Sequence, residues 1–370
     1  MFLITIILPF LIVLTILVLI HEFGHYLTAK KFGIKVEEFG FGFPPRMFGK
    51  KIGETIYSIN WLPIGGFVKL YGEDNAGGGS VRKTNNEPAT DLKRAFFARP
   101  AWQRATIVLA GVVMNFILAV VIISYLFAVP GVALPSKNIK IEEVSAGSPA
   151  QLAGLLKGDE IISVNGQKIT TTDKFISITH SSEGKNLSIE FTRHGQESLV
   201  NVVPRTNFPK GQGPLGVAIS SIQIIKYPWY QAPFYGTAEA LKFSWMILAG
   251  LGGMVTDLVT HGAPPKGVAG PIGVAQLTGQ AVSIGVEATL WFVAILSLNL
   301  AVVNVLPIPA LDGGRLFFIL IELVTGRKVP QRYETMSHAV GLVVLLSLIL
   351  VITLFDILRL ISGQSLLPKM

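Results

Sequence analysis

The chain has 370 residues, of which 50% are hydrophobic and 15% are charged, and its mean hydropathy is +0.55. An ordinary soluble domain carries about a quarter charged residues, so this composition excludes a soluble globular protein and indicates one embedded in a membrane. The formal net charge of +8 is modest for this length and unevenly distributed, which favours membrane topology over nucleic-acid binding.

Residues 1–30 are predicted to form the first membrane helix, because the segment Met1–Ile20 is uncharged and mostly apolar. Residues 1–20 contain no positively charged leader and no small-residue cleavage site, so we expect a retained span rather than a cleaved signal peptide. The span ends in the motif HEFGH at residues 21–25. On a helix this spacing places both imidazoles one turn apart on the same face, with the glutamate beside them, as a zinc hydrolase requires.

Residues 31–104 are predicted to form a loop with β-hairpins. The alternation in Thr55–Ile59 and the glycines that follow it are typical of short paired strands. The polar stretch 75–91 is predicted to be a surface loop.

The rest of the chain divides into three further spans and the segments between them. Each span is predicted from an uncharged apolar run, whereas the region between the second and third spans has globular composition followed by Gly- and Pro-rich sequence. Within that last stretch, residues 238–259 form an amphipathic pattern that we expect to lie at the membrane interface. The predicted segments are the second span at 105–129, a globular domain at 130–205, a linker with the interfacial segment at 206–286, the third span at 287–308, a loop at 309–337 and the fourth span at 338–358.

Basic residues orient these four spans. Residues 30–104 contain 13 Lys and Arg, whereas residues 137–266 contain 12 over almost twice the length. Short loops rich in Lys and Arg stay in the cytoplasm. We therefore expect the loops 31–104 and 309–337 on the cytoplasmic side of the membrane, with the globular domain and both termini on the other side.

The two histidines supply two metal ligands, whereas a catalytic zinc commonly has three protein ligands and a water. The chain contains no cysteine, so the third ligand must be another His, Asp or Glu. Asp312 follows the third span as closely as His21 follows the first, which places it at the same membrane depth. We therefore predict one Zn²⁺ per chain bound by His21, His25 and Asp312, with Glu22 as the general base. A lone HExxH match also occurs by chance, so the matching depth of Asp312 carries this prediction.

The HEFGH motif together with NVLPIPALDGG at 304–314 resembles the site-2 protease family of intramembrane zinc metalloproteases, in its bacterial regulator-of-sigma-E type. The resemblance covers essentially the whole chain and implies the same ligand and base assignments. It implies an α-helical polytopic membrane protein with four transmembrane helices, a re-entrant β-hairpin region on the cytoplasmic side and one inserted extracytoplasmic PDZ-like α/β domain. The implied activity is hydrolysis of peptide bonds within or near the transmembrane segments of membrane proteins.

The PDZ-like part of the resemblance lies in SPAQLAGLLKGDEIISVNG at 148–166. It looks like a PDZ domain of the bacterial protease type, with one copy evident. Such a domain usually binds extended C-terminal peptides, and a size filter that admits only trimmed substrates is an equal alternative.

The resemblance implies substrates that are single-span membrane proteins, such as a trimmed anti-sigma factor, or remnant signal peptides, and no nucleic acid. The alternative is a catalytically inactive relative that binds zinc or holds substrates, which the intact Glu22 argues against. A metal transporter is the weakest alternative, because the ionisable residues cluster at one depth.

A substrate-contact role is predicted for Ile56, Ser58 and Asn60, which would offer a strand edge to an unwound substrate, the alternative being a plain surface hairpin. Asn304 is predicted to hydrogen-bond the substrate backbone or the developing oxyanion, or equally another helix.

Two other polar residues, Asn115 and His338, are predicted to have structural roles. Asn115, in a GVVMNF sequence that resembles a family motif of the second span, is predicted chiefly to pack between helices. His338 flanks the fourth span and is predicted to lie at the membrane interface.

Overall fold

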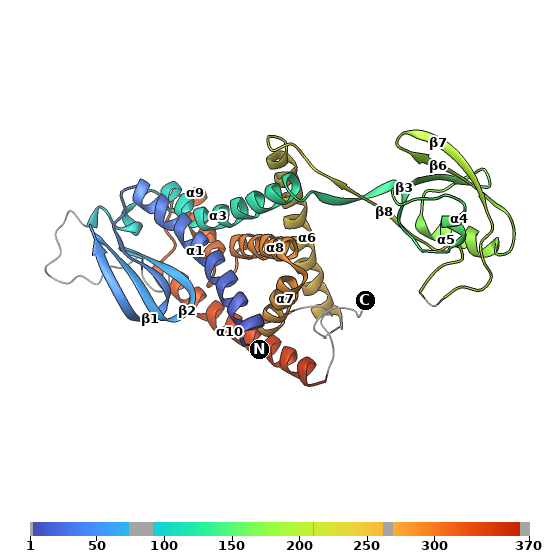
Figure 1. Cartoon of the computed structure of the whole chain (residues 1–370). Coiled ribbons are helices and arrows are strands. Elements are labelled where there is room, and N and C mark those ends of the chain that lie inside the picture. The colour runs from blue at the N-terminus through green and yellow to red at the C-terminus, as the bar shows by residue number, and fades with distance from the viewer. Residues whose placement is uncertain (1–2, 74–91, 210, 262–268, 363–370) are drawn as a thin grey trace. The chain divides into compact units, whose positions relative to one another are not determined.

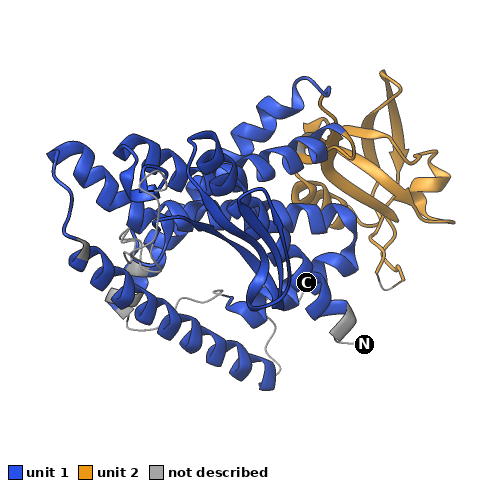
Figure 2. Ribbon diagram, turned by 90° about the vertical axis from the view of Figure 1, so that its left-hand side faces the viewer, with its two compact units in different colours: residues 1–128, 228–370 blue, residues 129–227 orange. Residues whose placement is uncertain are grey.

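The computed structural model describes residues 3–73, 92–209, 211–261 and 269–362. The predicted surface loop at 75–91 lies outside these residues. The chain divides into two compact units, a membrane unit of residues 1–128 and 228–370 and an inserted unit of residues 129–227 (Figure 2).

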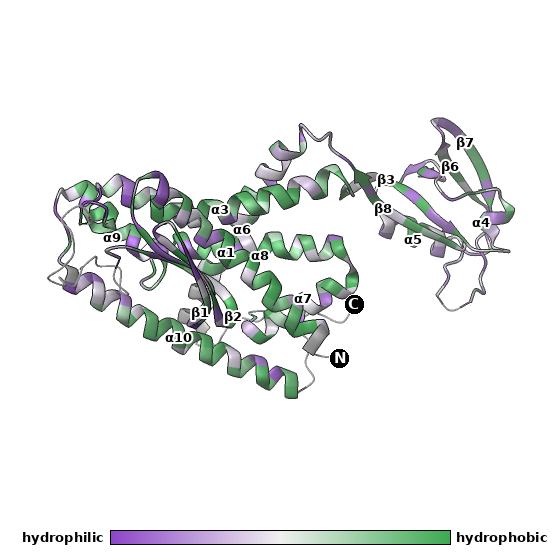
Figure 3. Ribbon diagram, turned by 60° about the vertical axis from the view of Figure 1, so that its left-hand side comes forward, coloured by the Kyte–Doolittle hydropathy of each residue, from purple (hydrophilic) through white to green (hydrophobic). Residues whose placement is uncertain are grey.

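Four helices in the described part of the membrane unit are long and apolar enough to cross a membrane. They confirm the number and order of the predicted spans, and Figure 3 shows them coloured mostly as hydrophobic. The first combines the short π-helix η1 (Leu3–Ile7) with α1 (Leu8–Lys31), and the others are α3 (Ala101–Ala128), α8 (Val286–Val305) and α10 (Gln331–Ile361). Helix α3 packs against both α1 and α8 (Figure 1).

The remaining helices of this unit are α6 (Ala232–His261), α7 (Pro271–Ile284), α9 (Asp312–Thr325) and the short 3-10 helix η2 (Phe96–Ala98). The stretch predicted as a linker with one interfacial segment therefore contains two helices, and α6 begins six residues before residue 238. Its small residues explain how closely it packs against α3, since Ala232, Gly236 and Ala240 recur every fourth position and are buried. Gly236 lies so close to Ser124 of α3 that a Cβ would collide with it.

The predicted β-hairpins appear as two long strands, β1 (Val36–Ile52) and β2 (Thr55–Leu70). Both strands bend, so that residues 38–41 of β1 pair on one side with residues 56–59 of β2 and on the other side with residues 66–69. The pairing therefore produces a sheet of four strand segments. Gly42 has a φ of +76° at the bend of β1, a conformation that glycine adopts without strain.

This pairing corrects the expectation for Ile56, Ser58 and Asn60. Ile56 pairs with both Glu38 and Lys51, and Ser58 pairs with both Gly40 and Gly49. Their segment is an inner one with neighbours on both sides, so it offers no free edge to a substrate.

The membrane unit has a buried core where the end of α1, the start of the sheet, the start of α3 and α9 meet. Its fully buried members include Ala29, Ile34, Val36 and Ile107. This core fixes the end of α1 that carries the HEFGH motif against α3 and α9.

The inserted unit is an antiparallel sheet of strand order β7-β6-β4-β3-β8, with β5 paired to β4. Its core is formed mainly by β-branched and aromatic side chains, among them Ile139, Ile161, Phe175 and Ile189. The last strand pairs with the first, so this unit extends beyond the predicted end at residue 205. Its elements are β3 (Val132–Val144), α4 (Pro149–Leu152), β4 (Glu160–Val164), β5 (Gln167–Lys168), α5 (Thr172–Ser181), β6 (Leu187–Arg193), β7 (Gln196–Val202) and β8 (Val217–Ile225).

Candidate metal centre and active site

Helix α1 places His21 and His25 on the same face, as the spacing predicts. Both residues are buried, with exposed fractions of 7% and 8%. Their Nε2 atoms lie 3.1 Å apart, with the rings nearly perpendicular. Both imidazoles therefore present the same ring nitrogen to one point.

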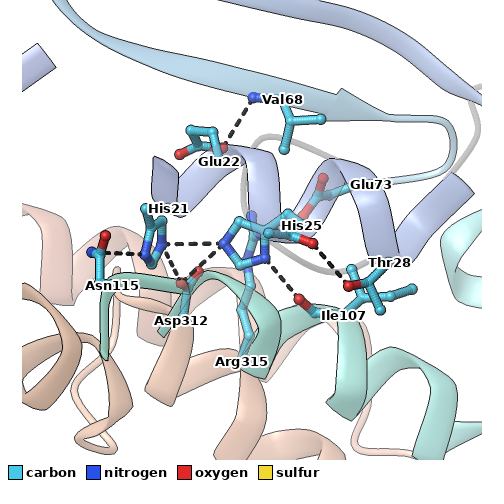
Figure 4. A network of polar contacts seen from close by, with 11 residues as sticks. His21, Glu22, His25, Thr28, Val68, Glu73, Ile107, Asn115, Asp312 and Arg315 are labelled. Atoms are coloured by element: carbon cyan, nitrogen blue, oxygen red, sulfur yellow. Dashed lines mark hydrogen bonds and ion pairs between the residues drawn. The ribbon is translucent and has the colours of Figure 1, made fainter. Parts of the chain in front are cut away.

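Asp312, the first residue of α9, comes to that point from 291 positions further along the chain. Its Oδ2 lies 2.8 Å from Nε2 of His21 and 3.3 Å from Nε2 of His25 (Figure 4). The two glycines after Asp312 let the loop fold this tightly, because a Cβ at Gly313 would collide with the carbonyl of Leu306.

These three residues form a group that could hold a metal ion. Ligands at about 2.0–2.2 Å around a tetrahedral zinc lie about 3.3–3.6 Å from one another. The separations of 2.8, 3.1 and 3.3 Å are at or slightly below the lower end of that range, and two imidazoles with one carboxylate are a donor set that zinc accepts. The residues present therefore fit a zinc ion.

Glu22 lies beside this group with its carboxylate turned towards the sheet. Its Oε2 accepts a hydrogen bond from the backbone N–H of Val68, at 3.1 Å. Val68 pairs with Phe39 on its other side, so the segment of β2 nearest Glu22 is an outer one.

Two cavities adjoin the group. One of about 590 Å³ is lined by Glu22, His25, Asp312 and Arg315, together with the outer segment Phe67–Leu70 of β2. The other, of about 210 Å³, is lined by residues that include His21, Glu22, Asp312 and the predicted Asn304. Glu22 and Asp312 thus border both cavities, whereas Ile56, Ser58 and Asn60 line neither of them.

One face of α3 lies against the two imidazoles. The carbonyl oxygen of Ile107 is 2.7 Å from Nδ1 of His25, and the amide nitrogen of Asn115 is 3.4 Å from Nδ1 of His21. Gly111 sits between them, where a Cβ would lie 2.5 Å from Nε2 of His25. The prediction of a mere packing role for Asn115 did not include this contact, although the four-residue spacing of Gly111 and Asn115 on an apolar helix was a usable signal.

His338, predicted to lie at the membrane interface, contacts the loop that leads to Asp312. It is buried, and its Nδ1 accepts a hydrogen bond from the backbone N–H of Ala310 at 3.0 Å. Ala310 has a φ of +76°, which is unfavourable for a residue with a side chain. The fourth span thus contacts the loop that carries Asp312.

An ion pair lines the larger cavity. The guanidinium of Arg315, one turn after Asp312, pairs with the carboxylate of Glu73. Both side chains are largely buried and line the cavity. Sequence reasoning did not identify either residue.

The sequence of the chain is similar to those of zinc metalloproteases. The model of the family "Peptidase family M50" matches residues 9–348. A zinc metalloprotease RasP of Geobacillus kaustophilus is 31% identical over 419 residues, covering 95% of this chain and 97% of that one. The regulator of sigma-W protease RasP of Bacillus subtilis is 30% identical, covering 96% and 98%. A relative from Clostridium perfringens is 35% identical over 352 residues, covering 94% and 97%.

Among solved structures, the PDZ domain of an SdrC-like protein from Listeria monocytogenes covers 23% of this chain and 90% of that one, with a TM-score of 0.21 and 20% identity.

Proposed function

The chain belongs to peptidase family M50, and on this premise we propose how its residues carry out proteolysis. It is a multi-pass membrane protein and an intramembrane zinc metalloprotease. We propose that His21, His25 and Asp312 bind the zinc and that Glu22 is the general base. The observation that carries this proposal is the convergence of three donor atoms within 3.3 Å of one another, with Glu22 on the same turn of α1.

When bound, zinc supplies a Lewis acid that polarises a carbonyl and lowers the pKa of water towards about 7. Glu22 then takes a proton from the attacking water and delivers it to the leaving amine. Its position supports this role, since it borders both cavities and is not part of the ligand group. The intact Glu22 also argues against the alternative of an inactive zinc-binding relative.

The substrate backbone would bind along Phe67–Leu70 rather than along the segment around Ser58. This outer segment of β2 lines the larger cavity and directs the N–H of Val68 towards Glu22. An extended substrate paired to it would have its scissile bond beside the ligand group, and strand pairing would satisfy the backbone groups freed when a transmembrane helix unwinds. A substrate carbonyl would compete with Glu22 for the Val68 N–H, which would release the base.

Asn304 would act from the smaller cavity. It lines that cavity together with Glu22 and Asp312, so its amide could donate a hydrogen bond to the oxyanion that develops on the scissile carbonyl.

We propose single-span membrane proteins or remnant signal peptides as substrates. The protein would lie in the bacterial inner membrane. Its metal centre would be near the cytoplasmic face, as the 13 Lys and Arg of residues 30–104 suggest. The inserted unit and both termini would then lie on the opposite side.

The inserted unit is proposed to be a PDZ-like peptide-binding domain. A cavity of about 280 Å³ lies between α5 and β8 and is lined by residues such as Phe175, His180, Leu215 and Ile219. β8 ends the strand order, so a peptide could pair with its outer side. If the unit is instead a size filter, filling this cavity with a larger side chain at Ile219 should leave cleavage of trimmed substrates unchanged.

The test of the protease assignment compares Glu22→Gln with Asp312→Ala in the full-length protein. Glu22→Gln should retain zinc and lose cleavage of a single-span substrate by about 10²–10⁴-fold, the usual contribution of a general base. Asp312→Ala should lose both zinc and cleavage. Glu287→Gln is the control, because it makes the same change at an exposed residue of α8 that lines neither cavity, and it should leave both properties near wild type. Cleavage by Glu22→Gln at the wild-type rate would contradict the mechanism.

A further inference from the structure

We propose that Asn115 is a positioning residue for the metal centre: its side-chain oxygen accepts the Nδ1–H of His21 and so holds Nε2 of that imidazole towards the metal. The inference rests on the proposed zinc site. It assigns to the second span a role in zinc binding, although that span supplies no ligand.

The hydrogen bonding of Asn115 and His21 supports this assignment, because the amide nitrogen faces a ring nitrogen that must itself carry a proton when His21 binds a metal. Asn115 is fully buried, and its Nδ2 faces Nδ1 of His21 at 3.4 Å. A neutral histidine that offers Nε2 to a metal carries its proton on Nδ1, so two donors would then face each other. The Oδ1 of Asn115 is also buried, and has no hydrogen-bond partner among the residues that the structure describes.

Exchanging the oxygen and nitrogen of the Asn115 amide removes the clash of two donors and gives Oδ1 a hydrogen-bond partner. The two orientations of an Asn side chain are assigned from hydrogen bonding, because their shapes are nearly the same. With the oxygen towards His21, the Nδ1–H donates to it, and the tautomer that ligates through Nε2 is fixed.

His25 provides an internal comparison. Its Nδ1 faces the carbonyl oxygen of Ile107 at 2.7 Å, a group that can only accept, while its Nε2 faces Asp312. His25 is therefore held in the same tautomer that we assign to His21. Both imidazoles present Nε2 to Asp312 and Nδ1 to α3.

The acceptors lie on one stripe of α3. Ile107, Gly111 and Asn115 are four residues apart and so share a helix face. Gly111 lies directly against both rings, since a Cβ there would be 2.5 Å from Nε2 of His25 and 2.7 Å from Cε1 of His21. The hydroxyl of Ser297 on α8 donates to the backbone carbonyl of Asn115 at 2.7 Å, which holds this turn of α3 in place.

The test measures zinc affinity of the purified full-length protein by chelator competition, in Asn115→Asp and Asn115→Leu. An acceptor to a ligating histidine typically contributes 10–100-fold to metal affinity, so we expect Asn115→Leu to bind zinc about 10–100-fold more weakly. Asn115→Asp is the same shape and can only accept, so it should bind zinc at least as tightly as wild type.

A packing role predicts the opposite order, because a buried carboxylate without a donor is less favourable than a leucine of similar volume. Asn115→Asp binding zinc no better than Asn115→Leu would therefore overturn the proposal. Nitrogen-15 NMR of histidine-labelled protein gives a second measurement. The Nδ1 signal of His21 should shift between wild type and Asn115→Asp, whereas that of His25 should stay in place, and a His21 signal that does not move would count against the assignment.

The two levels of inference fail separately. If wild-type protein binds no zinc, the proposed metal centre is wrong and this inference falls with it. If wild type binds zinc and the two variants rank in the packing order, only the role of Asn115 is wrong. Thermal unfolding of the zinc-free variants shows whether a loss of zinc reflects a loss of fold.

Discussion

Val68 donates its backbone N–H to the carboxylate of Glu22 across 3.1 Å, so the outer segment of β2 is hydrogen-bonded to the proposed catalytic base. The same N–H would therefore be available either to Glu22 or to a substrate strand paired with β2. This relationship supports the proposed pairing of an extended substrate with Phe67–Leu70, and it leads to the first prediction.

Val68→Pro should reduce cleavage about tenfold or more while zinc content stays normal. Proline removes the N–H that would pair with the substrate carbonyl, and a backbone partner left without its hydrogen bond costs about 1–3 kcal/mol. Val68→Ala keeps the N–H and is the matched control, with cleavage expected near wild type. Equal cleavage by the two variants would refute pairing of the substrate at this segment. Proline at Ser58 is a poor probe, because it would break an inner segment of the sheet itself.

The hydrogen bond between Ala310 and His338 should stabilise the loop that carries Asp312. Ala310 has a left-handed backbone, which costs a residue with a Cβ about 1–2 kcal/mol. We expect His338→Leu to weaken zinc binding, and the same change to be less harmful in an Ala310→Gly background, where that backbone is not strained. The measurement is a double-mutant cycle on zinc affinity. Additive effects of the two changes would show that His338 acts elsewhere.

The ion pair between Glu73 and Arg315 should contribute to folding mainly because neither charge can be left alone. Arg315→Met should lower the free energy of unfolding by about 2 kcal/mol, since it leaves a largely buried carboxylate without its partner. The double variant Glu73→Gln with Arg315→Met should recover part of that loss. Thermal unfolding of the single and double variants checks this, and a double variant less stable than both single ones would contradict it.

The inserted unit should lose stability in acid through Asp159. Burial by itself raises the pKa of this carboxyl, but hydrogen bonds from Arg193 and from the N–H of Leu156 outweigh it and hold the pKa below its usual range. A carboxylate with a lowered folded-state pKa contributes stability above its unfolded pKa of about 3.9, and that contribution is lost as the pH falls through the folded pKa. Asp159→Asn should cost about 2 kcal/mol at neutral pH and flatten the acid limb.

Hydrogen exchange of the Ile161 and Ile189 amides measures this stability within the full-length protein, because both residues belong to the core of the inserted unit. Wild type and Asp159→Asn with identical pH profiles would exclude Asp159 as the source of the acid sensitivity.

The ligand group could be predicted from the sequence because its chemistry is local. HEFGH places two predicted ligands and the proposed base on one helix, and the apolar span before Asp312 indicates the depth of the third predicted ligand. The four spans could be predicted for the same reason, because an uncharged apolar run of about 20 residues is typical of a transmembrane helix.

The contacts around that group could not be predicted, because they depend on which helix faces meet. The spacing of Gly111 and Asn115 indicates a shared helix face but not that this face meets His21, and nothing in the sequence around His338 indicates its contact with Ala310. The order of strand segments in β1 and β2 also escaped prediction. Alternation indicates strands but does not reveal that both bend, and the bends decide that Ser58 is inside and Val68 outside. The pairing of β8 with β3 was hidden by the Gly- and Pro-rich sequence that precedes β8.

The pairing of β3 with β8 has a consequence for how this chain can be altered. Val132 lies opposite Ile225, so the inserted unit begins and ends at adjacent positions of one ladder. A whole module can therefore be exchanged, lengthened or removed through a single pair of neighbouring attachment points. The inserted unit can therefore change in sequence or length without changing the residues that form the metal centre.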